Sequence, residues 1–316
     1  MLLNNEAMKR FTIVLAIALM FTALNAQVIT QMAKDNMKIE KGERPGSDDD
    51  RLSRRPMEVQ LDSSAVYYKL IDSAQMRIKE QDWALAEDYI RRAIATEPQN
   101  NTNSMLLSNL ATLQRYQGKL NEAVKNYTLA LDMTPNAVTL LLNRAAVHLQ
   151  RGDMDAAVAD FTRVRELDET EPESRYTLGM LALDRGDYDE AEKLFNEIRK
   201  ANPKSVLAFE GLGMMYKEQG DYAKATAHLS EAIKQDPNPT LLGNRADCYL
   251  VLKQLNNAAA DIQEALEKTP DDGFLYLLRA KLNKMRFNFG DMQRDINLAI
   301  KHGVDEETAK QIENLK

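Results

Sequence analysis

A short phrase returns at a fixed interval along the chain, and this recurrence limits the fold more than any other feature of the sequence. The stretches GKLNEA, GDMDAA, GDYDEA and GDYAKA begin at Gly118, Gly152, Gly186 and Gly220, each 34 residues after the one before. A constant period of this length indicates that one supersecondary structure is built again and again. The 316-residue chain is therefore expected to form an array of repeats.

Each repeat is predicted to be a pair of helices joined by a tight turn. Apolar residues recur at helical spacing, and no stretch alternates as a strand does. The glycine of the phrase suits a left-handed residue that ends the first helix, and an Asp or Asn directly after it can cap the second. With this glycine at position 15, seven repeats begin near Tyr67, Ser104, Val138, Pro172, Val206, Pro239 and Gly273.

Small residues at fixed positions support the same conclusion. Position 8 is alanine or glycine in all seven repeats, and position 20 is alanine in six of them: Ala86, Ala123, Ala157, Ala191, Ala225 and Ala258. Helices whose contact residues are small can cross at close range. Position 32 is proline in five repeats, which ends the second helix before the next repeat begins.

Repeat 5 carries the residues of a known signature: Phe209, Leu212, Gly213, Tyr216, Ala225, Leu229 and Pro237. This pattern resembles the tetratricopeptide repeat. The resemblance implies an all-α fold, a right-handed superhelical solenoid of about seven helix-turn-helix repeats. It also implies a concave groove lined by the first helix of each pair. The array is predicted over residues 65–303, with a polar capping helix at residues 304–316.

Residues 1–26 are predicted to be a secretory signal peptide, with Met8 as an alternative start. Two basic residues precede the apolar run Phe11–Leu24, which is shorter than the ~20 residues that span a bilayer. An uncleaved amino-terminal anchor is the alternative. Residues 27–64 mix both charges with Gly, Pro and Ser and are predicted to be a flexible linker. We expect a protein exported to the periplasm or cell envelope of a bacterium, with no integral membrane segment after signal removal.

The sequence offers little for catalysis or for nucleic acid. A formal charge of −7 argues against nucleic-acid binding, which needs a basic face. The three histidines lack metal-ligand spacing, and no glycine-rich phosphate loop is present. Cys248, the single cysteine, is predicted to be a small buried residue and not a nucleophile. We therefore expect no enzymatic activity, no cofactor and no metal.

The leading hypothesis is a non-enzymatic scaffold that binds a protein or peptide in the concave groove. The resemblance implies that positions 2, 5, 6, 9, 12 and 13 of each first helix face this groove. From these positions we predict a peptide site formed by Asn109, Tyr116, Asn143, Tyr176 and Met180. The amides can pair with a peptide backbone, and tyrosine gives a large contact area at low entropic cost. Some of these side chains could instead pack against neighbouring repeats.

Two further interpretations concern function. A structural or assembly component of an envelope or secretion complex, binding through its convex face or ends, is the alternative to a peptide-binding scaffold. Some members of the family grip the carboxylate terminus of chaperones, and the asparagines at position 6 match that clamp. The lysines and arginines of the clamp are missing, because Glu173 and Thr177 stand in repeat 4. Chaperone-tail binding is therefore rejected.

Three ion pairs are predicted from a comparison of the repeats with one another. Position 7 is arginine only in repeats 3, 6 and 7, and the same repeats carry aspartate sixteen residues later. The pairs are Arg144 with Asp160, Arg245 with Asp261 and Arg279 with Asp295. This joint occurrence indicates contact between the two helices of a repeat.

Overall fold

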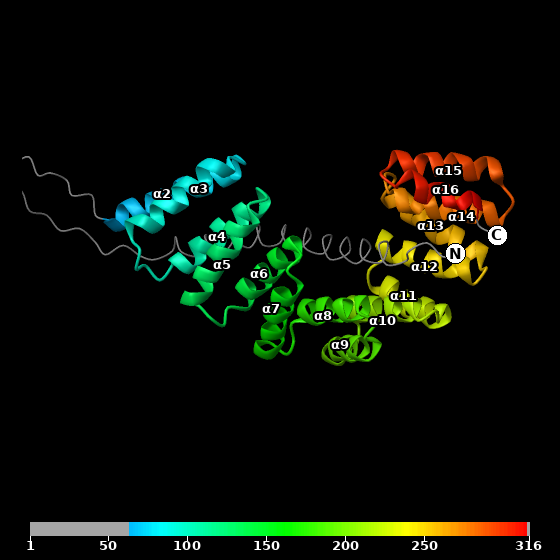
Figure 1. Ribbon diagram of the computed structural model, residues 1–316, viewed down its shortest axis with the longest axis horizontal. Helices are drawn as coiled ribbons and strands as arrows, with labels where there is room; N and C mark the ends of the chain where they lie inside the picture. Colours follow the sequence, from blue (N-terminus) through cyan, green and yellow to red (C-terminus); the bar gives the residue numbers. More distant parts are fainter. Residues whose placement is uncertain (1–62, 315–316) are drawn as a thin grey trace, which may run out of the picture. The chain divides into compact units, whose positions relative to one another are not determined.

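The computed structural model describes residues 63–314, which form fifteen α-helices and no strand (Figure 1). The predicted signal peptide, and all but the end of the predicted linker, lie outside the described residues. The helices are α2 (Ser63–Lys79), α3 (Trp83–Thr96), α4 (Asn103–Tyr116), α5 (Leu120–Met133), α6 (Val138–Arg151), α7 (Met154–Leu167), α8 (Pro172–Asp184), α9 (Tyr188–Ala201), α10 (Val206–Glu218), α11 (Tyr222–Gln235), α12 (Pro239–Val251), α13 (Leu255–Lys268), α14 (Gly273–Met285), α15 (Phe289–Lys301) and α16 (Glu306–Asn314).

The chain divides into two compact units, residues 1–169 and 170–316, here called the N-terminal and C-terminal units. The described part of the N-terminal unit contains repeats 1 to 3, formed by the pairs α2–α3, α4–α5 and α6–α7. The C-terminal unit contains repeats 4 to 7, formed by the pairs α8–α9 to α14–α15, and then α16. The predicted all-α fold of helix-turn-helix repeats is confirmed.

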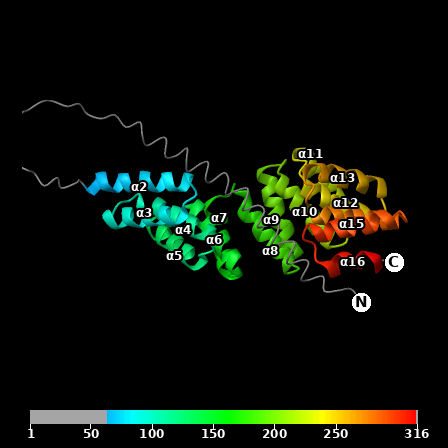
Figure 2. The same ribbon diagram turned by 90° about the horizontal axis from the view of Figure 1, so that it is seen from above.

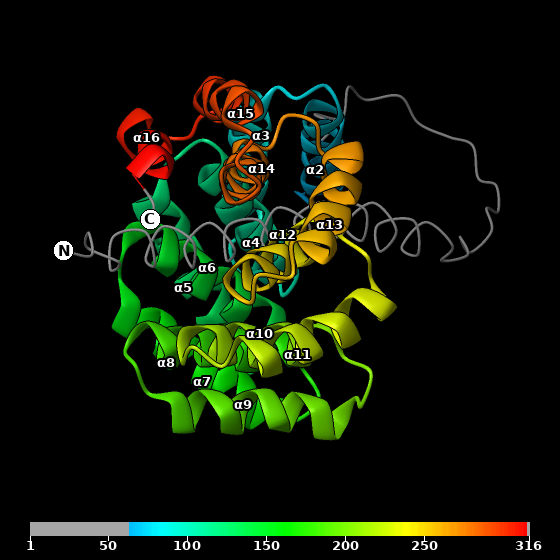
Figure 3. The same ribbon diagram turned by 90° about the vertical axis from the view of Figure 1, so that its right-hand side faces the viewer.

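Within each unit, successive repeats stack on one another. The second helix of one repeat packs against the first helix of the next, as α3 does with α4 and α11 with α12. First helices also contact each other directly, α4 with α6 in one unit and α8 with α10 in the other. Figure 3 shows α8 and α10 side by side, with α9 packed beneath both. The first helices of each unit thus form one shared face.

The turn between the two helices has the same backbone conformation in every repeat. Gly118, Gly152, Gly186 and Gly220 have φ between +74° and +82°. Repeats 1, 6 and 7 carry Gln81, Lys253 and Phe287 at this position, with φ of +61°, +58° and +58°. The left-handed turn predicted from glycine is therefore present, and three repeats build it with residues that adopt this conformation at a cost in free energy.

Aspartate after the turn caps several of the second helices, as expected. The side chains of Asp82, Asp187 and Asp221 each accept a hydrogen bond from a backbone N–H in the first turn of the following helix. Asp153 departs from this pattern, since its carboxylate pairs with Arg151 at 3.1 Å and does not cap α7.

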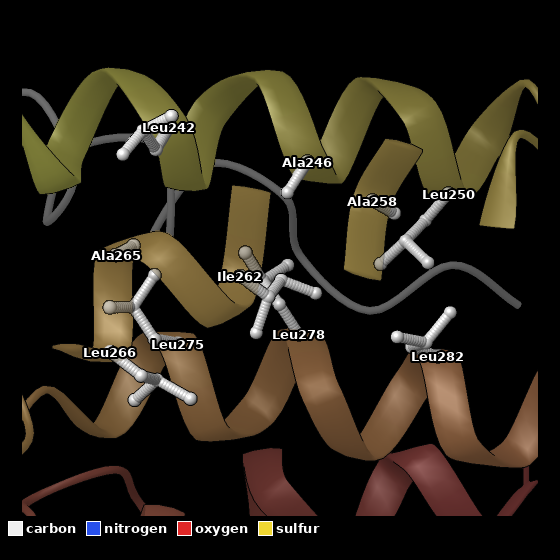
Figure 4. Packing of buried hydrophobic residues seen from close by; sticks show 10 residues of the cluster. All are labelled: Leu242, Ala246, Leu250, Ala258, Ile262, Ala265, Leu266, Leu275, Leu278 and Leu282. Carbon is white, nitrogen blue, oxygen red and sulfur yellow. The ribbon is translucent and has the colours of Figure 1, made fainter. Parts of the chain in front are cut away.

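The core lies between the helices and contains the small residues predicted for close crossing. The six alanines at position 20 are fully buried. In the C-terminal unit, Leu242 and Ala246 of α12 face Ile262 of α13 and Leu278 of α14 (Figure 4). Each fully buried leucine or isoleucine contributes ~1.5–3 kcal/mol relative to an exposed one. The apolar sides of these three helices thus pack together in one cluster.

Two glycines in the C-terminal unit make room for one aromatic ring. A methyl group on Gly179 of α8 would lie 2.5 Å from Cε1 of Phe195, and one on Gly211 of α10 would lie 2.4 Å from its Cδ1. Phe195 belongs to α9 and is fully buried. Helices α8, α9 and α10 therefore meet around this ring, and each glycine is needed for close approach.

The C-terminal unit ends in a short polar helix. Helix α16 packs on α14 and α15, and its buried residues are Ala309 and Ile312. Figure 2 shows α16 next to α15 at the end of the unit. The ammonium group of Lys284 donates to the carbonyl oxygens of Ile312 and Glu313, which are the kind of groups left unpaired at a helix end. A solenoid requires such a polar cover over its last apolar surface.

None of the helices in residues 63–314 is long and apolar enough to cross a membrane.

Candidate protein-binding surfaces

The first-helix face of the N-terminal unit carries three of the five predicted site residues. Asn109 and Tyr116 lie on α4, and Asn143 lies on the neighbouring α6. The two helices are linked by Arg115, whose Nε donates to Oε1 of Gln150 at 2.9 Å. Asn109 and Tyr116 are seven residues apart, two turns of helix, so they share one side of α4. The structure therefore places these three residues on two first helices that contact each other within one unit.

Exposure and hydrogen bonding distinguish this surface from the core beneath it. Tyr116 is 45% exposed, and burial of the remainder of its ring raises the pKa of its hydroxyl. Asn143 is only 7% exposed, yet neither it nor Asn109 forms a side-chain hydrogen bond to any of residues 63–314. The amide atoms of Asn143 are not fully enclosed, so water can satisfy them until a ligand takes its place. These amides are therefore free to pair with a ligand backbone.

The other two predicted residues, Tyr176 and Met180, lie on α8 in the C-terminal unit. Each is 1% exposed. The ring of Tyr176 lies 6.0 Å from that of Phe195, and burial together with the nearby carboxyl of Glu210 on α10 raises the pKa of its hydroxyl. We expected Tyr176 and Met180 to face an open groove, but neighbouring helices cover both side chains. The alternative raised for such residues, packing against the adjacent repeat, describes Tyr176.

Sequence reasoning left out one residue that the structure places near the same surface. Tyr68 of α2 is exposed, as is Met105 near the start of α4. The neighbouring Tyr67 donates to Oδ1 of Asn103 at 3.0 Å, which brings the start of α2 to the start of α4. Both Tyr68 and Met105 occupy position 2 of their repeats. The same position rule that selected Asn109 would have found Tyr68 had repeat 1 been included.

The first-helix face of the C-terminal unit is charged instead. Asp247 of α12 lies between Lys217 of α10, at 2.9 Å, and Lys281 of α14, at 3.1 Å. Burial disfavours the charged form of Asp247, but the two ammonium groups outweigh it and hold its pKa at about 2. One carboxylate therefore links three successive first helices, and both lysines are already engaged with it.

The three ion pairs predicted from the repeats are confirmed. In repeat 3, Nε and Nη2 of Arg144 donate to the two carboxylate oxygens of Asp160 at 2.8 and 2.7 Å. Nη1 of the same arginine donates to the hydroxyl of Thr128 in repeat 2. Repeats 6 and 7 contain the equivalent Arg245–Asp261 and Arg279–Asp295 pairs. Because the aspartates are buried and each arginine donates through Nε and Nη2 to its aspartate, these pairs hold the two helices of a repeat together.

Cys248 and His228, two of the side chains considered for chemistry, lie in packed surroundings. In residues 63–314, no three His, Cys, Asp or Glu side chains are placed to hold a metal ion. Burial raises the pKa of the Cys248 thiol to about 11, so the thiolate needed for nucleophilic attack is scarce near neutral pH. His228 is stacked on Tyr216, with ring centroids 5.4 Å apart, and burial lowers its pKa.

The stacked helix pairs, the left-handed turns and the shared first-helix face define an all-α repeat protein of the protein-binding class. Models of the tetratricopeptide repeat match residues 136–204, 176–238 and 216–273. A tetratricopeptide repeat protein from Parabacteroides merdae ATCC 43184 is 30% identical, with a TM-score of 0.66, over 78% of this chain and 97% of that one. The chain belongs to the tetratricopeptide repeat family, which is generally non-catalytic and provides scaffolds for protein–protein interaction.

Two less similar structures share the fold. PilW, described as a type IV pilus biogenesis factor, is 19% identical with a TM-score of 0.58, and the match covers 66% of this chain and 98% of PilW. The pilF protein of Pseudomonas aeruginosa is 14% identical with a TM-score of 0.54, over 69% of this chain and 99% of pilF. Comparison of the sequence with curated proteins gives no match.

Proposed function

We propose that this protein is a non-enzymatic scaffold of the bacterial cell envelope that binds an extended peptide segment on the first-helix face of its N-terminal unit. The observation that carries the proposal is the pair of asparagines, Asn109 and Asn143. Their amides have no hydrogen-bond partner among residues 63–314, and Asn109 lies two helical turns from the exposed Tyr116 on the same side of α4. An extended peptide offers the backbone donors and acceptors that such amides need.

The surface around these amides suits a peptide more than a folded domain or a small molecule. Met105, Asn109 and Tyr116 follow one side of α4, at spacings of four and seven residues. Exposed Tyr68 extends the apolar surface onto α2. A strip that crosses helices and alternates apolar contacts with amides can bind backbone and side chains together. We call Tyr68, Met105, Asn109, Tyr116 and Asn143 the N-terminal strip.

A peptide display screen against the full chain tests the proposal. Selected peptides are measured by calorimetry against the parent chain, Tyr116→Ala, and Tyr116→Ala combined with Asn143→Ala. Loss of a central aromatic contact should weaken binding at least about tenfold, and loss of the amide should add to it. Leu129→Ala on α5 is the control, because it removes an equally exposed apolar side chain from a second helix. All variants should keep the parent's thermal unfolding curve.

Equal affinity of the parent and the double variant would exclude the N-terminal strip as the peptide site. A screen that yields no peptide, together with a stoichiometric membrane complex in crosslinked cells, would favour the alternative of an assembly component that binds through its convex face or ends. The similarity to PilW and pilF concerns the fold and does not decide between these functions.

The envelope location is part of the proposal and has its own test. It rests on the apolar run Phe11–Leu24 and the charged segment after it. Amino-terminal sequencing of the protein from cell fractions should give a start near Gln27 in the periplasmic or envelope fraction. A cytoplasmic protein that keeps this apolar run would contradict export, without affecting the proposal for the N-terminal strip.

A further inference from the structure

The turn between α14 and α15 exposes two aromatic rings to solvent. Phe287 is 81% exposed and Phe289 is 56% exposed. Their rings meet edge to face, with centroids 6.5 Å apart and an interplanar angle of 75°. This contact covers only a small part of Phe287. Most of a large apolar side chain therefore stands in water at the tip of repeat 7.

Nothing in the fold requires phenylalanine at this turn. Phe287 has φ +58°, the left-handed conformation that four other repeats build with glycine. For a bulky residue this backbone conformation is a genuine outlier. Glycine would relieve the strain and remove the exposed ring. Strained backbone that persists where no packing benefit explains it is typical of functional positions.

Cations lie on the same turn as the two rings and on the neighbouring turn, although the chain as a whole carries a formal charge of −7. The guanidinium of Arg286 donates to the carbonyl of Leu255 at 3.2 Å, so the neighbouring turn of repeat 6 lies alongside. That turn presents Lys253, which is exposed and forms no ion pair within residues 63–314. Exposed Arg294 lies on α15 and pairs with Asp291. Three cations and one acid thus lie on the turn that carries Phe287 and Phe289, on the helix that follows it and on the neighbouring turn. The name repeat-7 tip is used for Lys253, Arg286, Phe287, Phe289 and Arg294.

We propose that the repeat-7 tip contacts the surface of an anionic lipid bilayer. A convex turn with projecting rings offers no groove for a peptide, whereas a bilayer interface accepts such rings among its headgroups and acyl chains. Arginine and lysine beside the rings pair with anionic headgroups while their stems cover apolar surface. The tip lies on a turn of the C-terminal unit and uses no residue of the N-terminal strip, so the proposal is independent of peptide binding.

Hydrogen exchange of the full chain with and without vesicles tests the proposal at the tip itself. With vesicles of phosphatidylglycerol and phosphatidylcholine, the amides of residues 284–291 should exchange at least about threefold more slowly, because the bilayer shields the turn. Vesicles of phosphatidylcholine alone should give much weaker protection, since the cations then lack partners. The equivalent turn of repeat 1, residues 79–83, is the internal reference and should not change. This readout is local, so an apolar amino terminus that also binds vesicles does not obscure it.

Phe287→Gly is the decisive variant, because glycine favours the backbone conformation of this turn and should leave the fold intact. It should abolish the vesicle-dependent protection of the tip. Gln81→Gly makes the same kind of change in repeat 1 and should leave the tip protected, and Lys253→Gln should weaken protection only on anionic vesicles. Unchanged exchange at the tip with anionic vesicles would overturn the proposal. So would protection that appears without lipid at high protein concentration and disappears in Phe287→Gly, because a second copy of the chain would then cover the tip.

Discussion

Arg245 and Asp261 face each other across the two helices of repeat 6 and are joined by two parallel hydrogen bonds of 2.8 and 2.7 Å. Nη1 of Arg245 donates to Ser230 of repeat 5 at 2.9 Å, so the guanidinium links three helices. The carboxylate of Asp261 is almost completely buried. A pair of this kind costs much more when one partner is removed than when both are replaced by apolar residues.

Asp261→Ala should therefore lower the free energy of unfolding by about 2–3 kcal/mol, because it leaves a half-buried arginine without its acid. Arg245→Leu combined with Asp261→Leu should recover at least half of this loss. Chemical denaturation of the parent, Arg245→Leu, Asp261→Leu and the double variant completes the cycle that measures the coupling. Glu264→Ala, which removes an exposed partner of Lys268 in the same repeat, should cost less than about 1 kcal/mol. Additive losses at Arg245 and Asp261 would show that the two do not interact.

Glycine at the turn positions of repeats 6 and 7 should stabilise the protein. Lys253 and Phe287 are held at φ +58°, where a side chain costs ~1–2 kcal/mol that glycine avoids. The greater freedom of glycine in the unfolded chain offsets part of this gain. We expect Lys253→Gly and Phe287→Gly each to raise the free energy of unfolding by about 0.5–1 kcal/mol in urea titrations.

Replacing a turn glycine by alanine should lower the free energy of unfolding. A methyl group on Gly152 would meet no atom within 4 Å, so Gly152→Ala tests the backbone conformation alone. It should cost about 1 kcal/mol. A neutral Gly152→Ala together with neutral glycine variants in repeats 6 and 7 would mean that the left-handed turn contributes little to stability.

Gly179→Ala should be destabilising, by about 1–3 kcal/mol, because the new methyl group would overlap the buried ring of Phe195. Phe195→Leu alone should also destabilise, since it leaves a cavity. The two changes together should cost clearly less than their sum, because leucine makes room for the methyl group. Thermal unfolding followed by circular dichroism measures all three. Simple additivity would mean that Gly179 is required for a reason other than the ring.

Stability should depend on pH through Glu210. Burial raises the pKa of its carboxyl to about 7, although the Tyr176 hydroxyl beside it acts in the opposite direction. The unfolded carboxyl titrates near its usual 4.5. Because the folded pKa is raised, the stabilising contribution is complete below about pH 4.5 and is lost as pH rises through 7. Glu210→Gln should therefore match the parent at about pH 4 and exceed its unfolding free energy by roughly 1–2 kcal/mol at about pH 8.

Denaturant titrations across this pH range test the prediction for Glu210. Glu264→Gln is the control, because it makes the same change at a glutamate that is exposed on α13. A constant difference between Glu210→Gln and the parent from acid to alkaline pH would show that Glu210 does not retain a proton in the folded state.

Features that repeat along the chain were predictable from the sequence. The glycine turn, the alanines of the helix crossing and the arginine–aspartate pairs each recur at a constant offset. A comparison of equivalent positions in different repeats therefore reveals their structural role. The Lys217–Asp247–Lys281 bridge was not predictable, because its members occupy positions 12, 9 and 9 and have no common spacing. Such a contact depends on how helices from different repeats approach one another.

The candidate site was only partly predictable for a similar reason. The position rule placed Asn109, Tyr116 and Tyr176 on the same kind of helix face, but it cannot tell which faces stay open. On α4 the face stays accessible at Tyr116. On α8 the same face is closed by Phe195 and Glu210 of the following helices, which buries Tyr176. Burial of a given position is set by the volume of its neighbours, and these differ from repeat to repeat.

The ring of Phe195 held between Gly179 and Gly211 also bears on how such a gene can change. Repeat proteins lengthen and shorten when single repeats are duplicated or deleted. The new protein folds when the helices of each repeat can pack against those of any other repeat. Here α9 of repeat 4 fits only an α10 that has glycine at the point of contact. A recombination event between these two repeats would separate the ring from one of its glycines. Repeats 4 and 5 should therefore be inherited together, as a heritable module twice the length of the repeat that the sequence displays.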